Sequence, residues 1–224
     1  MSAAARVPAH RSARHLLVET PERGRVIVAA MQSGTDPDAS DAALLAAYAG
    51  GDQSAARTLT TRHAPRVFAL ARRMLGESVE AEDVTQETML RLWRIAPDWE
   101  ADRAALGTWL YRVASNLCID RLRRRRTLGS DAVPEVADEA PGALSRLEEG
   151  DRARALHRAM AALPERQRLA LVLRHFEERG NPEIAAVLGV SVEAVESLLA
   201  RGRRELAARL LPQRAELGYG DGQV

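Results

Sequence analysis

The chain has 224 residues and a net charge of +1, and 46% of its residues are hydrophobic but only 4% are aromatic. This length allows one large or two small domains, and the abundance of Ala, Leu, Arg and Glu favours helices over strands. The single cysteine excludes an internal disulfide, and no apolar run approaches the length of a membrane span, so we expect a cytoplasmic protein.

The charge is unevenly distributed, and its distribution is more informative than its sum. Residues 102–126 contain seven Arg against two Asp, whereas residues 127–150 contain six acidic residues against one Arg. A second basic cluster, at 199–214, contains five Arg and one Glu. The pattern predicts two basic segments separated by an acidic one.

The predicted elements begin after residue 40. Residues 1–40 lack periodicity, so we predict a disordered extension there, with Met31 as an alternative start. Asp41 to Ala49 is predicted to be a short helix. Asp52 can cap a second helix, which Gly76 terminates, and Pro65 predicts a kink or restart within it.

Ser78 is a plausible cap for a third helix, which ends before Pro97. Its apolar face consists of Val84, Thr88, Leu92 and Ile95. A polar face carries Asp83, Gln86, Glu87 and Arg91. One face is therefore expected to enter a core and the other to remain available for a partner.

The helix from Thr108 to Arg126 also has two faces. Leu110, Val113, Ala114, Leu117 and Cys118 form an apolar face, on which Cys118 is expected to be a small buried hydrophobe. Trp109, Arg112, Asn116 and Arg123 share another face, and the helix ends in four consecutive Arg. Aromatic, guanidinium and amide groups are those that stack on unpaired bases, hold phosphates and read base edges. An amphipathic helix with a solvated basic end is the alternative.

Residues 127–150 contain Gly129, Pro134, Pro141 and Gly142 and are predicted to be a flexible acidic linker. Two helices are expected beyond it, Asp151 to Leu163 and Pro164 to Glu178, and residues 212–224 are expected to be a disordered tail.

Asn181 to Leu199 fits a helix-turn-helix. Ile184, Ala185 and Leu188 are expected to bury the first helix, Gly189 to form the turn, and Ser191 to cap a second helix anchored by Val195 and Leu199. The exposed stripe of the second helix would enter a major groove. An ordinary helical hairpin is the alternative.

Three blocks in this order resemble bacterial RNA polymerase sigma factors of the extracytoplasmic-function class. They are AEDVTQETMLRLWR (81–94), GTWLYRVASNLCIDRLRRRR (107–126) and PERQRLALVLRHFEERGNPEIAAVLGVSVEAVESLLARGRREL (164–206). The resemblance implies an all-α fold of two small helical domains, region 2 at 41–126 and region 4 at 151–211, joined by the linker 127–150.

The resemblance also implies three binding sites. Asp83, Gln86, Glu87 and Arg91 would bind core polymerase. Capture of the melted −10 strand would fall to Trp109, Tyr111, Arg112, Asn116, Arg123, Arg124, Arg125 and Arg126, with Asp98 to Ala105 as a specificity loop. The −35 duplex would meet Ser191, Glu193, Glu196, Ser197, Ala200, Arg201, Arg203 and Arg204.

The sequence departs from the family pattern at Glu196, Ser197 and Leu198, where a basic residue, Ser and Arg are common. A Glu can still accept a hydrogen bond from cytosine, so base reading survives chemically. The family's usual aromatic residue at the start of the helix-turn-helix block is also absent, and Asn181-Pro182 stands in its place. We expect a locally different but still capped start there.

The partners implied by the resemblance are core RNA polymerase, promoter DNA and an anti-sigma factor. A sigma-like decoy that binds an anti-sigma factor without binding DNA is the alternative, and an ordinary helix-turn-helix repressor would explain only the C-terminal half. The five His are scattered without metal-ligand spacing, and the chain has no Gly-rich phosphate loop. We therefore expect no enzyme, no metal and no cofactor.

Overall fold

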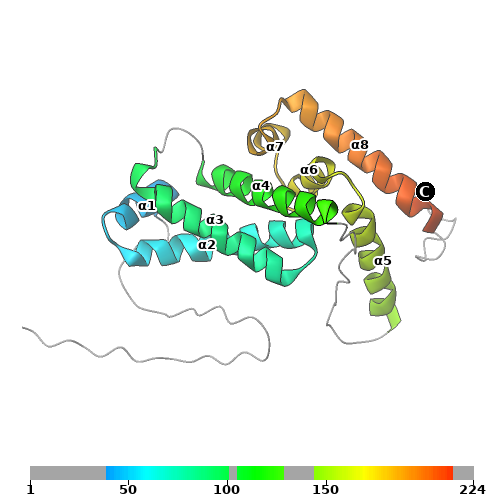
Figure 1. The fold of residues 1–224 in the computed structure, drawn as a ribbon, viewed down its shortest axis with the longest axis horizontal. Coiled ribbons are helices and arrows are strands. Elements are labelled where there is room, and N and C mark those ends of the chain that lie inside the picture. Colours follow the sequence, from blue (N-terminus) through cyan, green and yellow to red (C-terminus); the bar gives the residue numbers. More distant parts are fainter. Residues whose placement is uncertain (1–38, 101–104, 129–143, 214–224) are drawn as a thin grey trace, which may run out of the picture.

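A computed structural model describes residues 39–100, 105–128 and 144–213, and in these ranges every regular element is helical (Figure 1). The N-terminal half contains α1 (Asp41–Ala49), α2 (Gln53–Leu75), α3 (Ser78–Ile95), the 3-10 helix η1 (Ala96–Asp98) and α4 (Leu106–Thr127). The C-terminal half contains α5 (Leu144–Ala161), α6 (Glu165–His175), α7 (Asn181–Leu188), α8 (Val192–Leu210) and η2 (Leu211–Gln213). The all-α prediction is confirmed for these residues.

Several expectations fall outside the described residues. They concern the extension up to residue 38, most of the linker (129–143), the middle of the specificity loop (101–104) and the tail from residue 214. None of the described helices combines the length and the apolar character that crossing a membrane requires.

The signals at the ends of α2 act as predicted. Asp52 Oδ1 accepts a hydrogen bond from the Ser54 amide at 2.8 Å, and Gly76 ends the helix in the left-handed conformation with φ of 82°. The predicted restart at Pro65 is wrong, because α2 is continuous through that residue. Burial of Leu59 before the proline and Val67 after it keeps both parts of the helix on the same core.

The apolar faces of α3 and α4 meet the core as predicted. Val84, Thr88 and Leu92 of α3 are fully buried. Cys118 of α4 is also fully buried, and burial raises the pKa of its thiol to about 12, as expected of a structural rather than a reactive cysteine. The predicted cap of α3 is wrong by one residue: Glu77 is the N-cap, and the Ser78 hydroxyl accepts a hydrogen bond from Arg72.

Two helix boundaries in the C-terminal half differ from prediction by three residues or more. α5 begins at Leu144 rather than Asp151, so part of the expected linker is helical. Gly150 is the main residue opposing a helix there, at a cost of about 1 kcal/mol, and acidic charge does not break helices because Glu is a good helix former. α6 ends at His175 rather than Glu178, and the chain turns at Glu178, whose φ is 53°.

The helix-turn-helix forms as expected from α7 and α8. Ile184 and Val195 are fully buried, and Gly189 takes the left-handed conformation, with φ of 63°. The Ser191 hydroxyl accepts a hydrogen bond from the Ala194 amide at 3.3 Å and caps α8. At the start of α7, the Glu183 carboxylate accepts from the Gly180 amide at 2.9 Å, which provides the different but capped start that was predicted.

The two halves pack against each other, which the sequence did not predict. α4 contacts α6 and α7, and α2 contacts α6, so that α7 lies beside the N-terminal part of α4 (Figure 1). Buried apolar residues of both halves form one continuous cluster. The Arg168 guanidinium of α6 crosses between the halves and donates to the Met74 carbonyl at the end of α2, at 2.7 Å.

Candidate polymerase and nucleic-acid interfaces

The polar face of α3 is available at the surface. Asp83, Gln86 and Arg91 are exposed, and the Glu87 carboxylate accepts from Arg91 Nε at 2.8 Å. This ion pair lowers the pKa of Glu87. The four residues predicted to bind polymerase therefore lie on one exposed helical face and present charges of both signs.

Two exposed apolar residues on the same face were missed by the sequence analysis. Val79 is 70% exposed and Leu90 is 50% exposed. The spacing of Val79, Asp83, Gln86 and Leu90 places them in one stripe along α3. The four–three–four spacing is visible in the sequence, but periodicity alone does not show that apolar residues on a polar face contact a partner. Val79 and Leu90 give this face apolar area that binding of a partner would remove from water.

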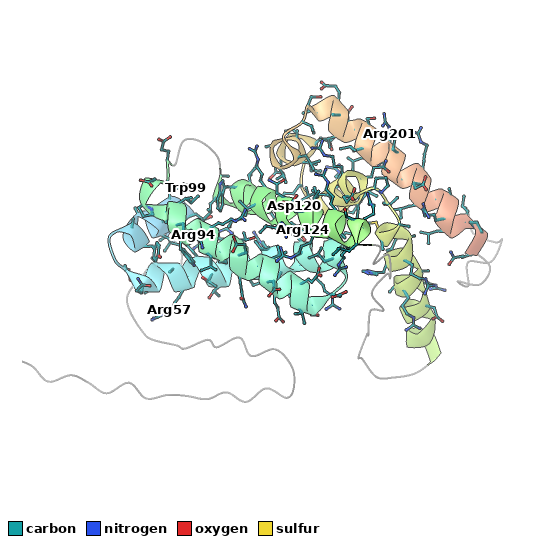
Figure 2. The ribbon with its side chains drawn as sticks, viewed as in Figure 1. Arg57, Arg94, Trp99, Asp120, Arg124 and Arg201 are labelled. Atoms are coloured by element: carbon teal, nitrogen blue, oxygen red, sulfur yellow. The ribbon has the colours of Figure 1, made fainter. Side chains whose placement is uncertain are left out.

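The exposed face of α4 carries Arg112, Asn116 and Arg123, and Arg124 is exposed beside it (Figure 2 labels Arg124). Trp109 is half-buried, and its ring packs edge-on against Trp99, with centroids 5.9 Å apart and planes at 88°. Trp99 ends the segment that follows α3, so it fixes the orientation of Trp109. Together these groups provide an amide, guanidinium groups and an aromatic edge on one surface.

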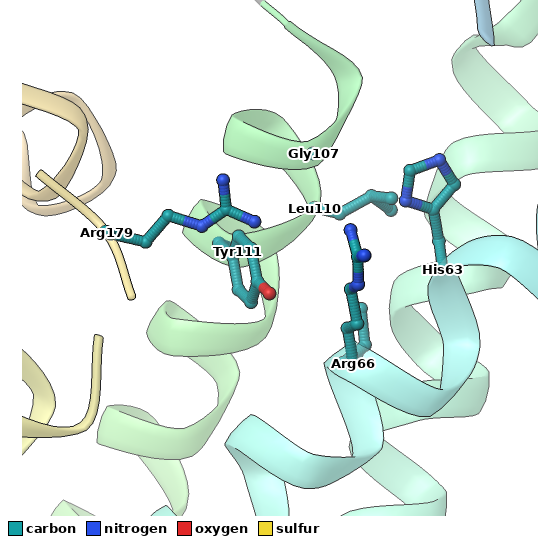
Figure 3. A pocket seen from close by; sticks show the side chains of 7 residues that line it. His63, Arg66, Gly107, Leu110, Tyr111 and Arg179 are labelled. Carbon is teal, nitrogen blue, oxygen red and sulfur yellow. The ribbon is translucent and has the colours of Figure 1, made fainter. Parts of the chain in front are cut away.

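Tyr111 does not lie with the other residues predicted to capture the −10 strand. It lies about 140° around α4 from Asn116, because successive residues are about 100° apart, and only 4% of its surface is exposed. Its hydroxyl donates to Glu177 Oε2 at 2.7 Å, and the Arg179 guanidinium lies 5.0 Å from the centre of its ring (Figure 3). Burial and the hydrogen bond to Glu177 raise the pKa of Tyr111.

The four arginines at the end of α4 do not act as a uniform basic run. Arg123 and Arg124 are exposed, whereas Arg125 is 20% exposed and forms ion pairs with Glu80 at 2.7 Å and Glu77 at 3.1 Å. Arg126 pairs with Glu165 of α6 at 2.6 Å. The expectation that all four attract phosphate needs correction, because Arg125 neutralises the acidic start of α3 instead.

The outer face of α8 is exposed where the prediction places base and phosphate contacts. Ser191, Glu193, Glu196, Arg201, Arg203 and Arg204 are exposed, and Ser197 and Ala200 are partly buried (Figure 2 labels Arg201). The acidic residues lie in the first half of the helix and the basic residues in the second. This order fits base contacts near the N-terminus of a recognition helix and phosphate contacts further along.

The described residues contain no group of three or more His, Cys, Asp and Glu side chains that could hold a metal ion. His63 is buried and lies 2.9 Å from Asp41 Oδ2, while His157 is half-buried and His175 is exposed. A shallow groove of about 600 Å³ lies between the halves, lined in part by Arg66, Arg73 and Phe176.

Two family models match the chain in order. The model described as Sigma-70 region 2 matches residues 59–127, and the model described as Sigma-70, region 4 matches residues 153–206. The first match includes α3 and α4, and the second includes the helix-turn-helix. The sequence resemblance drawn from the three blocks is therefore confirmed.

Curated relatives point to the same family. The ECF RNA polymerase sigma factor SigM of Mycobacterium tuberculosis is 37% identical over 172 residues, which cover 77% of this chain and 85% of that protein. SigE of Mycolicibacterium smegmatis, also an ECF RNA polymerase sigma factor, is 36% identical over 175 residues, covering 75% of this chain and 67% of that protein.

Solved structures share the fold. CnrH, solved in complex with the cytosolic domain of CnrY, is 32% identical, with a TM-score of 0.57, and the match covers 77% of this chain and 97% of CnrH. The sigma factor RpoE of Bartonella quintana, solved with the anti-sigma factor NepR, is 22% identical, with a TM-score of 0.56 over 69% of this chain and 96% of RpoE. At that identity, the likeness to RpoE concerns the fold alone.

Proposed function

The chain belongs to the RNA polymerase sigma factors of the extracytoplasmic-function class, and from this membership we propose that it directs core polymerase to promoters by reading two DNA elements. Residues 41–126 act as region 2, residues 151–211 act as region 4, and residues 127–150 connect them. The protein works in the cytoplasm by binding alone, without a cofactor or a reaction of its own.

The exposed face of α3 binds core polymerase in this proposal. Asp83, Gln86, Glu87 and Arg91 supply hydrogen bonds and charge, and Leu90 supplies apolar area between them. An isolated surface ion pair such as Glu87–Arg91 contributes little stability because water screens it, so exchanging it for contacts with a partner costs little.

The face of α4 that carries Arg112 and Asn116 captures the melted −10 strand. Extracting a base from the stack costs a few kcal/mol, which stacking and pocket hydrogen bonds offset. The Asn116 amide can both donate to and accept from a base edge, and Trp109 supplies the ring beside it. Arg123 and Arg124 attract the backbone without reading sequence.

The exposed face of α8 reads the −35 duplex. Glu193 and Glu196 lie in the half of the helix that meets base edges, where a carboxylate accepts a hydrogen bond from cytosine N4. Arg201, Arg203 and Arg204 then meet phosphates. If replacing Glu196 by Gln left the preferred −35 sequence unchanged, Glu196 would have no place on the reading face.

An anti-sigma factor is the proposed regulatory partner. The structure of CnrH was solved with the cytosolic domain of CnrY, and RpoE was solved with an anti-sigma factor. The matched length and identity of CnrH support a protein partner that binds the present chain as the CnrY domain binds CnrH.

The observation that carries the proposal is the capped helix-turn-helix with an exposed polar stripe, preceded in the same chain by an exposed α4 face bearing Asn116. The test is transcription by core polymerase from a library of genomic fragments, with and without the protein. New transcripts starting downstream of shared −35 and −10 sequences are expected. No promoter-dependent transcripts, together with binding to an anti-sigma factor, would establish the decoy function instead.

A further inference from the structure

One buried carboxylate lies between the two halves of the molecule. The Glu177 side chain, just after α6, is 7% exposed. Its Oε2 accepts a hydrogen bond from the Tyr111 hydroxyl of α4 at 2.7 Å, and its Oε1 pairs with Arg73 Nη1 of α2 at 3.0 Å. Both partners belong to the N-terminal half, whereas Glu177 belongs to the C-terminal half.

We call the arrangement with the two halves packed together the closed state. The contacts of Glu177 with Arg73 and Tyr111 exist only in this state. A carboxylate removed from water is costly unless it is paired and hydrogen-bonded, and both groups that satisfy Glu177 are provided across the interface. When the halves separate, water can hydrogen-bond to the Glu177 carboxylate in place of Arg73 and Tyr111. The contact therefore adds stability only while the halves remain together.

The surroundings form a cationic receptor for this carboxylate. The Arg73 guanidinium also lies 4.8 Å from the centre of the Phe176 ring, next to Glu177 in sequence. The Arg179 guanidinium lies 5.0 Å from the centre of the Tyr111 ring (Figure 3). Arg66 lines the same groove and forms no ion pair with any carboxylate that the structure describes. Arg179 is already paired with Glu183 at 3.0 Å, so Arg73 is the cation that neutralises Glu177, and Arg66 adds positive charge to the groove.

The turn that positions Glu177 is strained. α6 stops at His175, and Glu178 adopts a φ of 53°, which costs a non-glycine residue about 1–2 kcal/mol. The Arg179 amide closes the turn by donating to the Leu173 carbonyl at 2.9 Å. Continuing the helix would avoid this strain, so the interdomain contacts of Phe176, Glu177 and Arg179 offset it.

The closed arrangement brings the two DNA-reading surfaces too close together for a promoter. A Cβ at Gly189 would lie 3.9 Å from Arg112 Nη2, and Glu193 follows only four residues later. At no more than 3.6 Å per residue plus one arginine side chain, the Cα atoms of Arg112 and Glu193 lie within about 25 Å of each other. The −10 and −35 elements are about 25 base pairs apart, or about 85 Å at 3.4 Å per base pair.

We propose that Glu177, held by Arg73 and Tyr111, is a latch that keeps the chain in a closed state unable to engage both promoter elements. Opening the latch is then a condition for promoter binding, which rests on the proposed function. A partner that binds only the open chain has an apparent affinity equal to its intrinsic affinity multiplied by the fraction of chains that are open.

The test compares Glu177→Gln with Glu178→Gln in the full chain. The two changes remove the same charge at adjacent positions, but Glu178 is exposed, and the ion pair with Arg73 and the hydrogen bond from Tyr111 both go to Glu177. Fluorescent dyes on cysteines introduced at exposed Glu82 and Ala208 report the separation of the halves by energy transfer. Cys118 is fully buried and needs no replacement.

Glu177→Gln is expected to lower energy transfer and to decrease by about threefold to tenfold the concentration needed for half-maximal binding to core polymerase with promoter DNA. Glu178→Gln is expected to leave both unchanged. Arg73→Gln should reproduce the Glu177→Gln effect, and the double variant should add little to either. Arg73 is 37% exposed, so this second variant tests the latch without a buried substitution.

Equal energy transfer in Glu177→Gln, Arg73→Gln and wild type would overturn the latch. Failure of the latch can be distinguished from failure of the proposed function. Promoter-dependent transcription with no difference between Glu177→Gln and Glu178→Gln would reject the latch alone. Opening of Glu177→Gln without transcription from any fragment would reject the promoter-reading function while retaining the latch.

Discussion

Gly202 of α8 lies directly against Leu171 of α6: a Cβ at position 202 would stand 2.9 Å from Leu171 Cδ1. Leu171 is itself 2% exposed and has little room to move. We predict that Gly202→Ala lowers the free energy of unfolding by about 1–3 kcal/mol through overpacking, although Ala is the better helix former by about 1 kcal/mol. Urea denaturation measures this change.

Gly107→Ala is the matched control for this prediction. Gly107 is also helical, but a Cβ there would have no neighbour within 4 Å. Its replacement should raise the free energy of unfolding by about 0.4–1 kcal/mol, because the unfolded chain loses freedom. A Gly202→Ala variant as stable as Gly107→Ala would show that α6 and α8 do not pack this closely.

The cap of the recognition helix gives a second prediction. The Ser191 hydroxyl accepts a hydrogen bond from the Ala194 amide, so Ser191→Ala should cost about 1 kcal/mol of stability. Ser191→Asp supplies an equivalent acceptor and should retain most of it. Thermal denaturation distinguishes the variants. Equal melting temperatures for Ser191→Ala and wild type would show that the Ser191 hydroxyl does not stabilise the start of α8.

The exposed apolar side chain on α3 gives a third prediction. Leu90 is 50% exposed, so Leu90→Ala should hardly change folding stability. It should weaken binding to core polymerase by about fivefold or more, because full burial of a Leu side chain contributes about 1.5–3 kcal/mol and Leu90 is half-exposed in the free chain. Leu211→Ala, at a 63% exposed position beyond α8, is the control. If both variants bound polymerase as wild type does, Leu90 would lie outside the interface.

The dependence of stability on pH gives a fourth prediction. Burial lowers the pKa of His63 below its ordinary value of 6.5, and the neighbouring Asp41 only partly opposes this effect. As the pH falls, His63 therefore binds a proton in the unfolded chain before it does so in the folded chain. The free energy of unfolding that neutral His63 contributes is present above pH 6.5, and it is lost as the pH falls toward the pKa of His63 in the folded chain.

We expect the free energy of unfolding to fall as the pH drops from about 7.5 to 5.5, and His63→Gln to flatten this dependence. His157, whose pKa is also lowered by burial, contributes in the same direction and remains in the variant. Urea titrations at several pH values supply the curve. The same slope in His63→Gln and wild type would contradict the assignment.

The sequence carried enough information for the local elements. Asp52, Gly76, Gly189 and Ser191 act within a few residues of their own helix ends, so their residue types alone indicated where those helices begin and end. The buried faces of α3 and α8 followed from helical periodicity in the same way.

The packing of the two halves could not be predicted from such signals. Tyr111 and Glu177 are 66 residues apart, and no local pattern distinguishes an aromatic residue that meets DNA from one that meets a distant carboxylate. Arg125 and Arg126 illustrate the same limit, since the acids that bind them lie in α3 and α6. The early end of α6 follows from these long-range contacts as well.

If α4 captures the melted −10 strand, thymines of the −10 element become unpaired and react with permanganate. Core polymerase with the wild-type protein should make thymines in the −10 element reactive. Asn116→Ala should reduce that reactivity by tenfold or more, roughly the effect of 1.4 kcal/mol or more, while binding to core polymerase stays unchanged. Unreactive thymines with the wild-type protein, or equal reactivity with Asn116→Ala, would contradict the account.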